Sequence, residues 1–469
     1  MSNGKTTFAL FFGNRGFFPA SLQASAREQV TETLKALGHK TIALDADATR
    51  HGAVETPEEG RIYAEFLRKN RGKYGGVILS LPNFGDETGA ISALKDCGVP
   101  ILIQAYPDEL DRMAPAVRRD SFCGKFSIMD VFVQYGLPFT ALKPHTVHPG
   151  SAAFEANVEY FDRLCRVVGG MKEMVVGAIG ARTTAFKTVR IDELALQKHG
   201  ITMETLDLSD VFARMKALKA TDARLRDKAR VLKDYTCWKG VPSKAFTAIT
   251  KLGVVIDSLI EEYRMDALAL RCWVEMQQQL GISPCVLLSE LNDRGIATAC
   301  EVDIGNAVAM HALRLAGGMP ATCLDWNNNY GDDEDKCILF HCGPVPQSLM
   351  VEKGRITDHA ILANAVGEGC GWGCNAGRIA PGPFTYSSML TRDGSLCFYL
   401  GEGRFTVDRI PDDFFGCAGV AEIDGLQDKL LTIGYQGHRH HVSVTPGRLA
   451  TAVNEAFTKY LGYDVTLLA

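Results

Sequence analysis

Short apolar runs alternate with amphipathic stretches over roughly the first 165 residues of the chain. The apolar runs have the length and composition of buried strands, and Ser21–Leu37 has the spacing of an amphipathic helix. The expected strands are Thr7–Phe12, Lys40–Leu44, Gly75–Leu81 and Val99–Ile103. Such alternation is typical of a parallel sheet with helices on both faces, so an α/β fold is predicted here.

A second alternation of strands and helices follows the helical pattern Ala152–Gly169 and opens with the strand Met174–Ile179. We therefore place a domain boundary near residue 170 and predict two α/β domains, 1–170 and 171–350. The charge-rich stretch Lys216–Lys233 is interpreted as a helix with a solvated face, because acidic and basic residues interleave along it.

The pattern changes after Pro346, where glycine and proline become frequent and short β-type runs follow. This composition predicts an antiparallel, β-rich third domain over 351–469, closed by a helix at Leu449–Leu461. Its expected strands are Phe384–Leu390, Leu396–Leu400, Leu431–Tyr435 and His441–Val444. The predicted fold class is α/β, with two doubly wound domains followed by a β-rich C-terminal domain.

Two acids flank one helical segment in the second domain. Glu301 ends the apolar run that starts at Ile296, a helical pattern covers Asp303–Gly317, and Asp325 ends the next run. Strand, helix and strand form a βαβ unit with parallel strands, so both carboxylates are expected at the carboxyl edge of one sheet, where open α/β folds bind ligands. A third run brings His341 to the same edge.

Two carboxylates with an imidazole suit a hard or borderline cation, or an acid/base pair. A bound cation could chelate adjacent oxygens of a polyol substrate. The alternative is structural: the acids cap helices, and His341 is a core histidine. Asp303 is the better N-cap candidate, which frees Glu301. Further along, strand alternation predicts that His440 and His441 cannot both face one site.

Bulk properties narrow the function classes. The 469 residues are 46% hydrophobic and 22% charged with a net charge of −5, which argues against nucleic-acid or membrane-surface binding. Apolar runs are too short for a bilayer and the N-terminus lacks a signal-peptide pattern, so a cytoplasmic location is expected. No GxGxxG motif follows the first strand, which disfavours a dinucleotide site. The 14 cysteines are interpreted as small buried hydrophobes, and the Cys370/Cys374 pair as loop packing.

Several motifs together resemble the L-fucose isomerase and L-arabinose isomerase superfamily, and more specifically its shorter fucose isomerase-like branch. They are Leu288–Asp303, Leu324–Asn327, Phe340–Gly343, Gly377–Phe384, His440–Val442, Asn14–Pro19, Ile103–Pro107 and Gly180–Arg182. The resemblance implies two Rossmann-like α/β domains and a β-rich third domain. It also implies aldose–ketose isomerisation through a cis-enediol(ate).

The resemblance further implies a metal site. In the fucose isomerase pattern, residues matching Glu301, Asp325 and His441 hold Mn²⁺ (Mg²⁺ or Co²⁺ being alternatives), and the two acids shuttle the proton between C1 and C2. The arabinose isomerase pattern adds a histidine that matches His341. That pattern has Glu where this chain has Asp325, which favours the fucose-type arrangement.

Family members are homo-oligomers whose sites are shared between protomers, so a trimer or hexamer is expected. The implied substrate-binding residues come from three places: Arg15, Asn83 and Gln104 across an interface; Arg182, Thr183 and Phe186 in a loop over the metal; and Trp326 and His440 next to the ligands. The small-molecule substrate is expected to be a sugar.

Two other functions stay open: a non-catalytic sugar-binding protein, and a metal-dependent hydrolase or lyase acting on a sugar acid. Substrate identity is open as well. A neutral aldose is the first expectation, but cationic residues near predicted loop ends keep an anionic (sulfonated or phosphorylated) sugar under consideration. These residues are Arg15, Lys125, Arg182 and Lys187.

Overall fold

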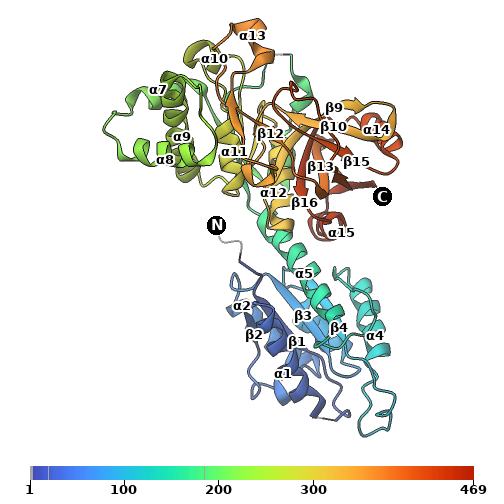
Figure 1. Cartoon of the computed structure of the whole chain (residues 1–469). Coiled ribbons are helices and arrows are strands. Elements are labelled where there is room, and N and C mark those ends of the chain that lie inside the picture. The colour runs from blue at the N-terminus through green and yellow to red at the C-terminus, as the bar shows by residue number, and fades with distance from the viewer. Residues whose placement is uncertain (1–3, 20, 184, 469) are drawn as a thin grey trace. The chain divides into compact units, whose positions relative to one another are not determined.

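The computed structural model describes residues 4–19, 21–183 and 185–468 and divides into two compact units (Figure 1). The first unit runs to Gly169 and includes Glu455–Gly462, and the second holds Gly170–Asn454 with the chain from Tyr463 onward. Residues 171–350 and most of 351–469 lie together in the second unit, and their division into two domains stays a prediction. In the described parts of the chain, no helix combines the length and apolar character needed to cross a membrane.

The first unit contains a four-stranded parallel sheet in the order β2-β1-β3-β4. Its strands are β1 (Phe8–Phe12), β2 (Thr41–Ala43), β3 (Gly76–Leu81) and β4 (Ile101–Ala105). The helices are α1 (Ser21–Ala36), α2 (Pro57–Lys69), α3 (Glu87–Leu94), α4 (Ser121–Gln134) and α5 (Ala152–Met171). The predicted strands and the helices at both ends of this region are confirmed, with small shifts in their bounds.

Helices cover both faces of this first sheet, as the apolar strands predict. Phe11 meets Tyr63 of α2 edge to face with ring centroids 5.1 Å apart, whereas Phe8 stacks on Phe161 of α5 at 5.6 Å. Residues three apart on a strand point to opposite faces, so α2 and α5 pack on opposite sides.

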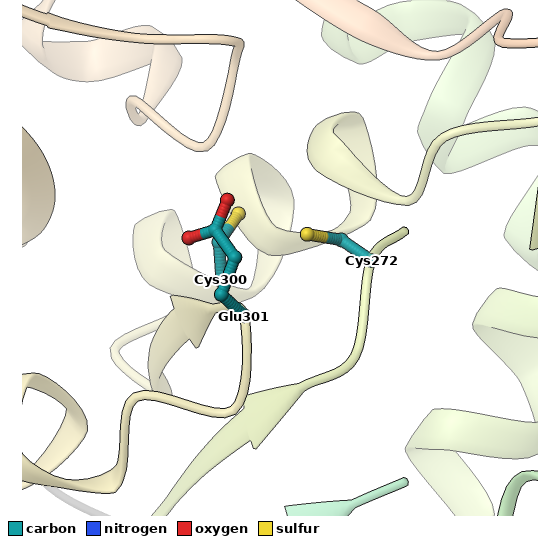
Figure 2. Close-up of side chains that lie close together, drawn as sticks. All are labelled: Cys272, Cys300 and Glu301. Carbon is teal, nitrogen blue, oxygen red and sulfur yellow. The ribbon is translucent and has the colours of Figure 1, made fainter. Parts of the chain in front are cut away.

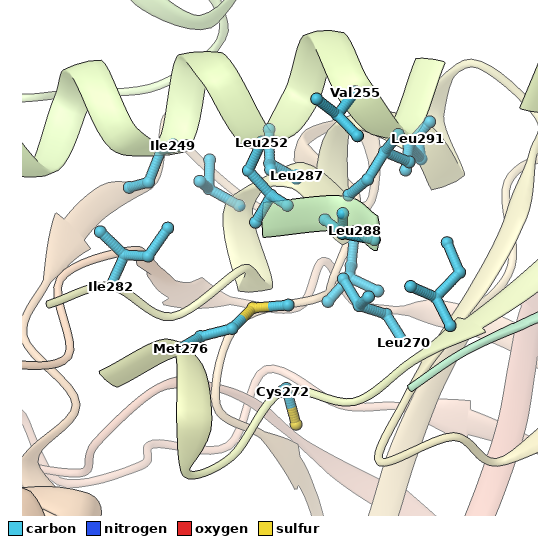
Figure 3. Packing of buried hydrophobic residues seen from close by; sticks show 14 of the residues in the cluster. Ile249, Leu252, Val255, Leu270, Cys272, Met276, Ile282, Leu287, Leu288 and Leu291 are labelled. Carbon is cyan, nitrogen blue, oxygen red and sulfur yellow. The ribbon is translucent and has the colours of Figure 1, made fainter. Parts of the chain in front are cut away.

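The second unit contains another four-stranded parallel sheet, ordered β6-β5-β7-β8. Its strands are β5 (Val175–Ile179), β6 (Thr202–Leu206), β7 (Ala267–Leu270) and β8 (Ala297–Cys300). The helices around it are α6 (Glu193–Lys198), α7 (Leu208–Ala217), α8 (Ala223–Tyr235), α9 (Ser243–Tyr263), α10 (Glu275–Leu280) and α11 (Cys285–Asp293). Figure 3 shows the apolar core between α9 and this sheet, with Leu252, Val255 and Leu270 among its side chains.

The charge-rich segment 216–233 does not form one helix. Helix α7 ends at Ala217, and α8 starts at Ala223 with Asp222 as its N-cap, whose side chain accepts a hydrogen bond from the Arg224 N–H. The N-cap aspartate is the sequence signal that separates the two helices.

A nine-stranded, mostly antiparallel sheet makes up the rest of the second unit, in the order β11-β12-β15-β10-β9-β16-β13-β14-β17. Its strands are β9 (Thr322–Tyr330), β10 (Asp333–His341), β11 (Arg355–Thr357), β12 (Cys374–Arg378), β13 (Gly382–Arg392), β14 (Ser395–Phe405), β15 (Cys417–Glu422), β16 (His441–Pro446) and β17 (Asp464–Leu468). Associated helices are α13 (Ala360–Val366), α14 (Leu426–Tyr435) and α15 (Ala450–Glu455).

The predicted strand Leu431–Tyr435 is wrong, because these residues end helix α14. Its buried residues Leu426 and Ile433 are seven positions apart, which is two helical turns. A short apolar run cannot by itself distinguish a strand from a buried helical face, which explains the error.

The predicted βαβ unit around the acid pair is also wrong. Strand β8 lies in the parallel sheet, whereas β9 pairs antiparallel with β10 and β16 in the large sheet. The connecting helix α12 (Ile304–Gly317) contacts strands of both sheets, and all its residues except Leu315 and Gly317 are buried. A helix that is apolar nearly all round is covered on two sides, so it separates the sheets instead of joining two strands of one.

Candidate active site

Four predicted residues meet although their strands belong to different sheets. The His441 Nε2 atom lies 3.3 Å from Glu301 Oε2 and 3.4 Å from Asp325 Oδ1. The His341 Nε2 atom lies 3.6 Å from the same Glu301 oxygen. Asp325 on β9 stands opposite His441 on β16 in the strand register, and Glu301 reaches them from the end of β8. The large sheet therefore supplies three of the groups and the parallel sheet one.

The turn that leaves β8 presents Glu301. Glu301 and Val302 both adopt left-handed backbone conformations, with φ of 54° and 59°. For residues with a Cβ this costs about 1–2 kcal/mol each, and strain of this kind persists where the surroundings hold it in place. The Trp273 indole N–H donates to Glu301 Oε1 at 3.1 Å, and only 8% of Glu301 is exposed. The carboxylate is therefore held rigidly.

Asp303 fixes the tautomer of His441. The Nδ1 of His441 lies 2.7 Å from Asp303 Oδ2, and since an ionised carboxylate can only accept, Nδ1 carries the proton. Asp303 also pairs with Arg439 and caps α12 by accepting from the Asn306 N–H at 3.1 Å. The lone pair of His441 Nε2 consequently points toward Glu301 and Asp325, an arrangement typical of metal-binding histidines.

His341 has the opposite tautomer. Its Nδ1 accepts a hydrogen bond from the Cys342 backbone N–H at 2.9 Å, so the proton of the neutral ring is on Nε2. The two buried histidines therefore face Glu301 differently: His441 presents a lone pair, and His341 presents an N–H.

The local charges shift the pKa values of these groups. Burial alone would raise the pKa of Glu301, but the His341 and His441 imidazoles and the Trp273 indole lower it to about 2. Burial opposes ionisation of Asp303 too, but Arg439 and His441 outweigh it and lower the pKa of that carboxyl. For His441, burial is outweighed by the hydrogen bond to Asp303 and by the nearby acids, which raises its pKa. Glu301 and Asp303 are thus ionised at neutral pH.

The donor set fits a divalent cation. Among the described residues, Glu301 Oε2 and Asp325 Oδ1 have no hydrogen-bond partner although both atoms are buried. Buried polar atoms are almost always satisfied, so two such acceptors beside one imidazole lone pair call for a positive charge. Ligand atoms of Glu301, His341 and His441 lie within 4.8 Å of one another, as do those of Asp325, His440 and His441.

The predicted loop lies over this cluster. The Phe186 ring packs against Trp273, His440 and His441, with centroids 5.7, 5.5 and 5.7 Å away. Thr183 is buried, and its hydroxyl has no hydrogen-bond partner within the described parts of the chain. Arg182 belongs to the same loop and contacts the Thr183 carbonyl at 3.5 Å, while Thr184 lies outside the described residues.

His440 and His441 do face one site, contrary to the prediction. His440 Nε2 lies 3.7 Å from the same Asp325 oxygen that His441 approaches, although 44% of the His440 side chain is exposed. Strand alternation does not apply because β16 starts only at His441 and His440 sits in the bend before it.

Trp326 does not face the acid pair. Trp326 follows Asp325 on β9 and so points to the other face, where its indole donates to the Tyr399 hydroxyl at 3.2 Å and packs in the core of the large sheet. Arg15, Asn83 and Gln104 lie at the carboxyl edge of the first sheet, in the other compact unit.

Sequence reasoning missed the roles of Trp273, Arg439 and, in part, Asp303, which it predicted only as a helix cap. Trp273 follows β7, so the rule that placed Glu301 at a strand end could also have placed Trp273 there. Asp303 gave no sequence signal of its contact with His441, because the two are 138 residues apart.

Comparison with known proteins identifies both ends of the chain. Residues 9–172 match the N-terminal domain of fucose/sulfoquinovose isomerases, and residues 339–468 match the C-terminal domain of L-fucose isomerase. A sulfoquinovose isomerase from Priestia aryabhattai is 22% identical over 84% of this chain and 85% of its own length. Those from Alkalicoccus urumqiensis and Clostridium sp. (strain MSTE9) are 22% and 26% identical over 61% and 43% of this chain, and over 63% and 45% of their own lengths.

The two matched regions lie at the N-terminal and C-terminal parts of the chain, and they agree with the motifs in the sequence. The chain therefore belongs to the fucose isomerase-like superfamily and is an isomerase.

Proposed function

We propose that this isomerase interconverts an aldose and a ketose and uses a divalent cation bound by Glu301, Asp325 and His441. The observation that supports the proposal is the position of His441 Nε2, 3.3 Å from one carboxylate oxygen and 3.4 Å from the other, with its proton held on Nδ1 by Asp303. Two carboxylates and one imidazole suit Mn²⁺, with Mg²⁺ or Co²⁺ as alternatives. When bound, such a cation supplies Lewis-acid polarisation of the sugar oxygens.

Glu301 and Asp325 carry the proton transfer. Isomerisation moves one proton between adjacent carbons, so it needs a base that is ionised at working pH and an acid that can return the proton. The lowered pKa of Glu301 keeps it ionised, and its rigid backbone and Trp273 contact keep it in position. Phe186, packed over Trp273 and the two histidines, would exclude water from the reacting carbons.

His341 acts as a hydrogen-bond donor to a sugar oxygen and not as a cation ligand. Its Nε2–H is buried and has no partner among the residues the structure describes, while the Cys342 N–H occupies Nδ1. A cation ligand needs a lone pair on the nitrogen that faces the site, which His441 has and His341 lacks. Replacing His341 by Gln, which can still donate, should raise KM for sugar while Mn²⁺ affinity stays within about twofold of the wild type.

An anionic sugar is a specific substrate candidate. The relatives that match this chain are named sulfoquinovose isomerases, which supports a sulfonated hexose as the first sugar to test. Arg182 belongs to the loop over the cluster and is exposed, so it is the first cation to test for contact with an anionic group. Replacing Arg182 by Ala should then weaken turnover of the sulfonated sugar more than that of a neutral aldose.

The proposal is tested by stripping the full chain with EDTA, adding back Mn²⁺, and following ketose formation in D₂O across neutral, sulfonated and phosphorylated aldoses. We expect turnover to be lost on stripping and restored by Mn²⁺, with deuterium appearing at C1 or C2 of the product. Full activity in the stripped enzyme would contradict cation dependence. Product without deuterium and without an isomerised carbonyl would favour a hydrolase or lyase.

The expected homo-oligomer and its shared site remain part of the proposal. Arg15 lies in the first unit, where it pairs with Glu87 and lies over the Phe84 ring at 4.4 Å. If it contacts sugar from a neighbouring copy, Arg15→Ala should raise KM without changing the mass of the assembly. Normal turnover would remove Arg15 from the substrate-binding set.

A further inference from the structure

Two cysteine thiols lie beside Glu301 and have no role in the proposed reaction. Cys272 follows β7, and Cys300 is the last residue of the neighbouring strand β8. Both thiol sulfurs and one Glu301 carboxylate oxygen lie within 4.8 Å of one another. Figure 2 shows the Cys300 sulfur next to the Glu301 carboxylate, with the Cys272 thiol directed toward both.

Apolar side chains surround the two sulfur atoms of this group. Cys272 is 4% exposed and Cys300 is fully buried, and both belong to the core cluster that includes Met276 and Leu270 (Figure 3). Two sulfur donors therefore lie beside the same carboxylate that faces His341 and His441.

Simple packing does not account for the arrangement. Buried cysteines act as small hydrophobes in many cores, but that role requires no carboxylate beside them. Here the ligand atoms of Cys272, Cys300 and Glu301 lie within 4.8 Å of one another, and all three residues are buried. A carboxylate and adjacent sulfurs are a mixed ligand set that soft or borderline cations accept and that Mg²⁺ and Mn²⁺ do not favour.

We propose that Cys272, Cys300 and Glu301 form a second, inhibitory site for a thiophilic divalent cation such as Zn²⁺ or Cd²⁺. Each thiol releases its proton to solvent when its sulfur binds, so one cation displaces two protons. Because Glu301 belongs to both ligand sets, occupation of the sulfur site withdraws it from the oxygen-and-imidazole site. The cation binding itself does not depend on the proposed function, because it needs neither sugar nor turnover.

The test is a Cd²⁺ titration of the full chain without sugar, read by the ultraviolet charge-transfer absorption of cadmium–thiolate bonds. The exposed Cys123 and Cys237 are first replaced by Ser to remove surface thiols. We expect one cadmium–thiolate site per chain, and at least tenfold weaker binding in Cys272→Ala and in Cys300→Ala. Cys165→Ala, which removes a buried cysteine of the first unit, is the matched control and should bind as the parent does.

Two results would overturn the proposal: no thiolate absorption in the parent, or unchanged absorption in the Cys272→Ala/Cys300→Ala double variant. A far-ultraviolet circular dichroism spectrum and a urea unfolding midpoint like those of the parent show that the double variant folds. If the isomerase assay fails while the cadmium band appears and depends on both cysteines, the proposed function is wrong and this site stands.

Discussion

The two parallel sheets of this chain have the same topology and different strand ends. Each orders its strands second, first, third, fourth, with all neighbours parallel. At the carboxyl edge of the first sheet lie the amides of Asn14, Asn83 and Gln104; at that of the second lie Cys272, Trp273 and Glu301. Because the two sheets share one architecture, the differences between their edges come from these residues.

The amides of Asn14, Asn83 and Gln104 at the first edge all have hydrogen-bond partners within the first unit. Asn83 donates to Asn14 and accepts from the Arg15 N–H at 3.2 Å, and Gln104 accepts from Ser80 at 2.6 Å and donates to the Val147 carbonyl at 2.7 Å. At the second edge, Glu301 Oε2 has no such partner in the described chain. Among the described residues, the unpaired buried atom beside Asn14 at the first edge is the neutral Gln23 Oε1, so an unpaired carboxylate, and not sheet topology, distinguishes the second edge.

The largest expected effect comes from replacing the Glu301 carboxylate by an amide, the group found at the first edge. Glu301→Gln keeps the shape of the side chain but removes its charge and its capacity as a base. Turnover should fall at least about 1000-fold, since both acid/base catalysis and cation binding are affected. Aldose-to-ketose conversion measures it.

Asp333→Asn is the control for this change, because it neutralises an exposed acid beside the β9–β10 hairpin turn. It should leave turnover within about twofold of the wild type, by the same reasoning that isolated surface charges contribute little. Substantial activity in Glu301→Gln would show that Glu301 is not the acid on which turnover depends.

The next effect concerns the buried pair that supports the second edge. Asp303→Asn keeps an N-cap for α12 but leaves Arg439 buried without its charge partner, which should cost about 3–5 kcal/mol of unfolding free energy. Urea unfolding measures it.

Asp207→Asn is the matched control, because Asp207 caps α7 and pairs with no arginine or histidine among the described residues. A similar loss in both variants would mean that Asp303 matters only as a cap.

A substitution at the first edge should lower the stability of the fold without changing the affinity for the cation. Asn83→Ala removes the acceptor of the Arg15 and Gly85 N–H groups and one of the two donors to Asn14, which should lower the unfolding free energy by about 1–3 kcal/mol. Mn²⁺ affinity, measured by calorimetry, should be unchanged. A weakened affinity would show that the two edges are not independent.

The smallest effect is a pH dependence specific to the first unit. Burial lowers the pKa of Lys125 from 10.5 to about 8 in the folded protein. Between these values the unfolded chain binds more protons than the folded one, so stability rises with pH there. Relative to Lys125→Met, the wild type should gain about 1 kcal/mol between pH 7 and pH 9, as measured by denaturant unfolding. A parallel pH profile in the two proteins would contradict it.

Local signals predicted much of this fold. Apolar runs and their flanking turns placed the strands of the first sheet, and strand-end position correctly located Glu301. Asp325 was predicted at a strand end too, but it lies inside β9, which continues to Tyr330. What the sequence did not predict correctly was which strands pair with one another. The run Ala321–Asp325 fits either a parallel or an antiparallel strand, and only the apolar circumference of α12 indicates a layer on each side of it.

The residues of the candidate site that belong to a family motif could be predicted from the sequence. Contacts between residues far apart in the chain could not. The convergence of His441 with Glu301 was expected from the family pattern. The tautomers were not, because they depend on whether Asp303 or the Cys342 backbone meets Nδ1, and sequence spacing does not encode those contacts.

Helix α12 approaches β13 closely at Gly305, where a Cβ would lie 2.4 Å from the Met389 carbonyl oxygen. The gap between the helix and the large sheet therefore has no room for even one methyl group. A side chain at position 305 would widen that gap, which would move Glu301 relative to Asp325 and so impair turnover of every substrate. New substrate specificity in this enzyme should therefore arise in the loop at Arg182–Phe186 and not at position 305.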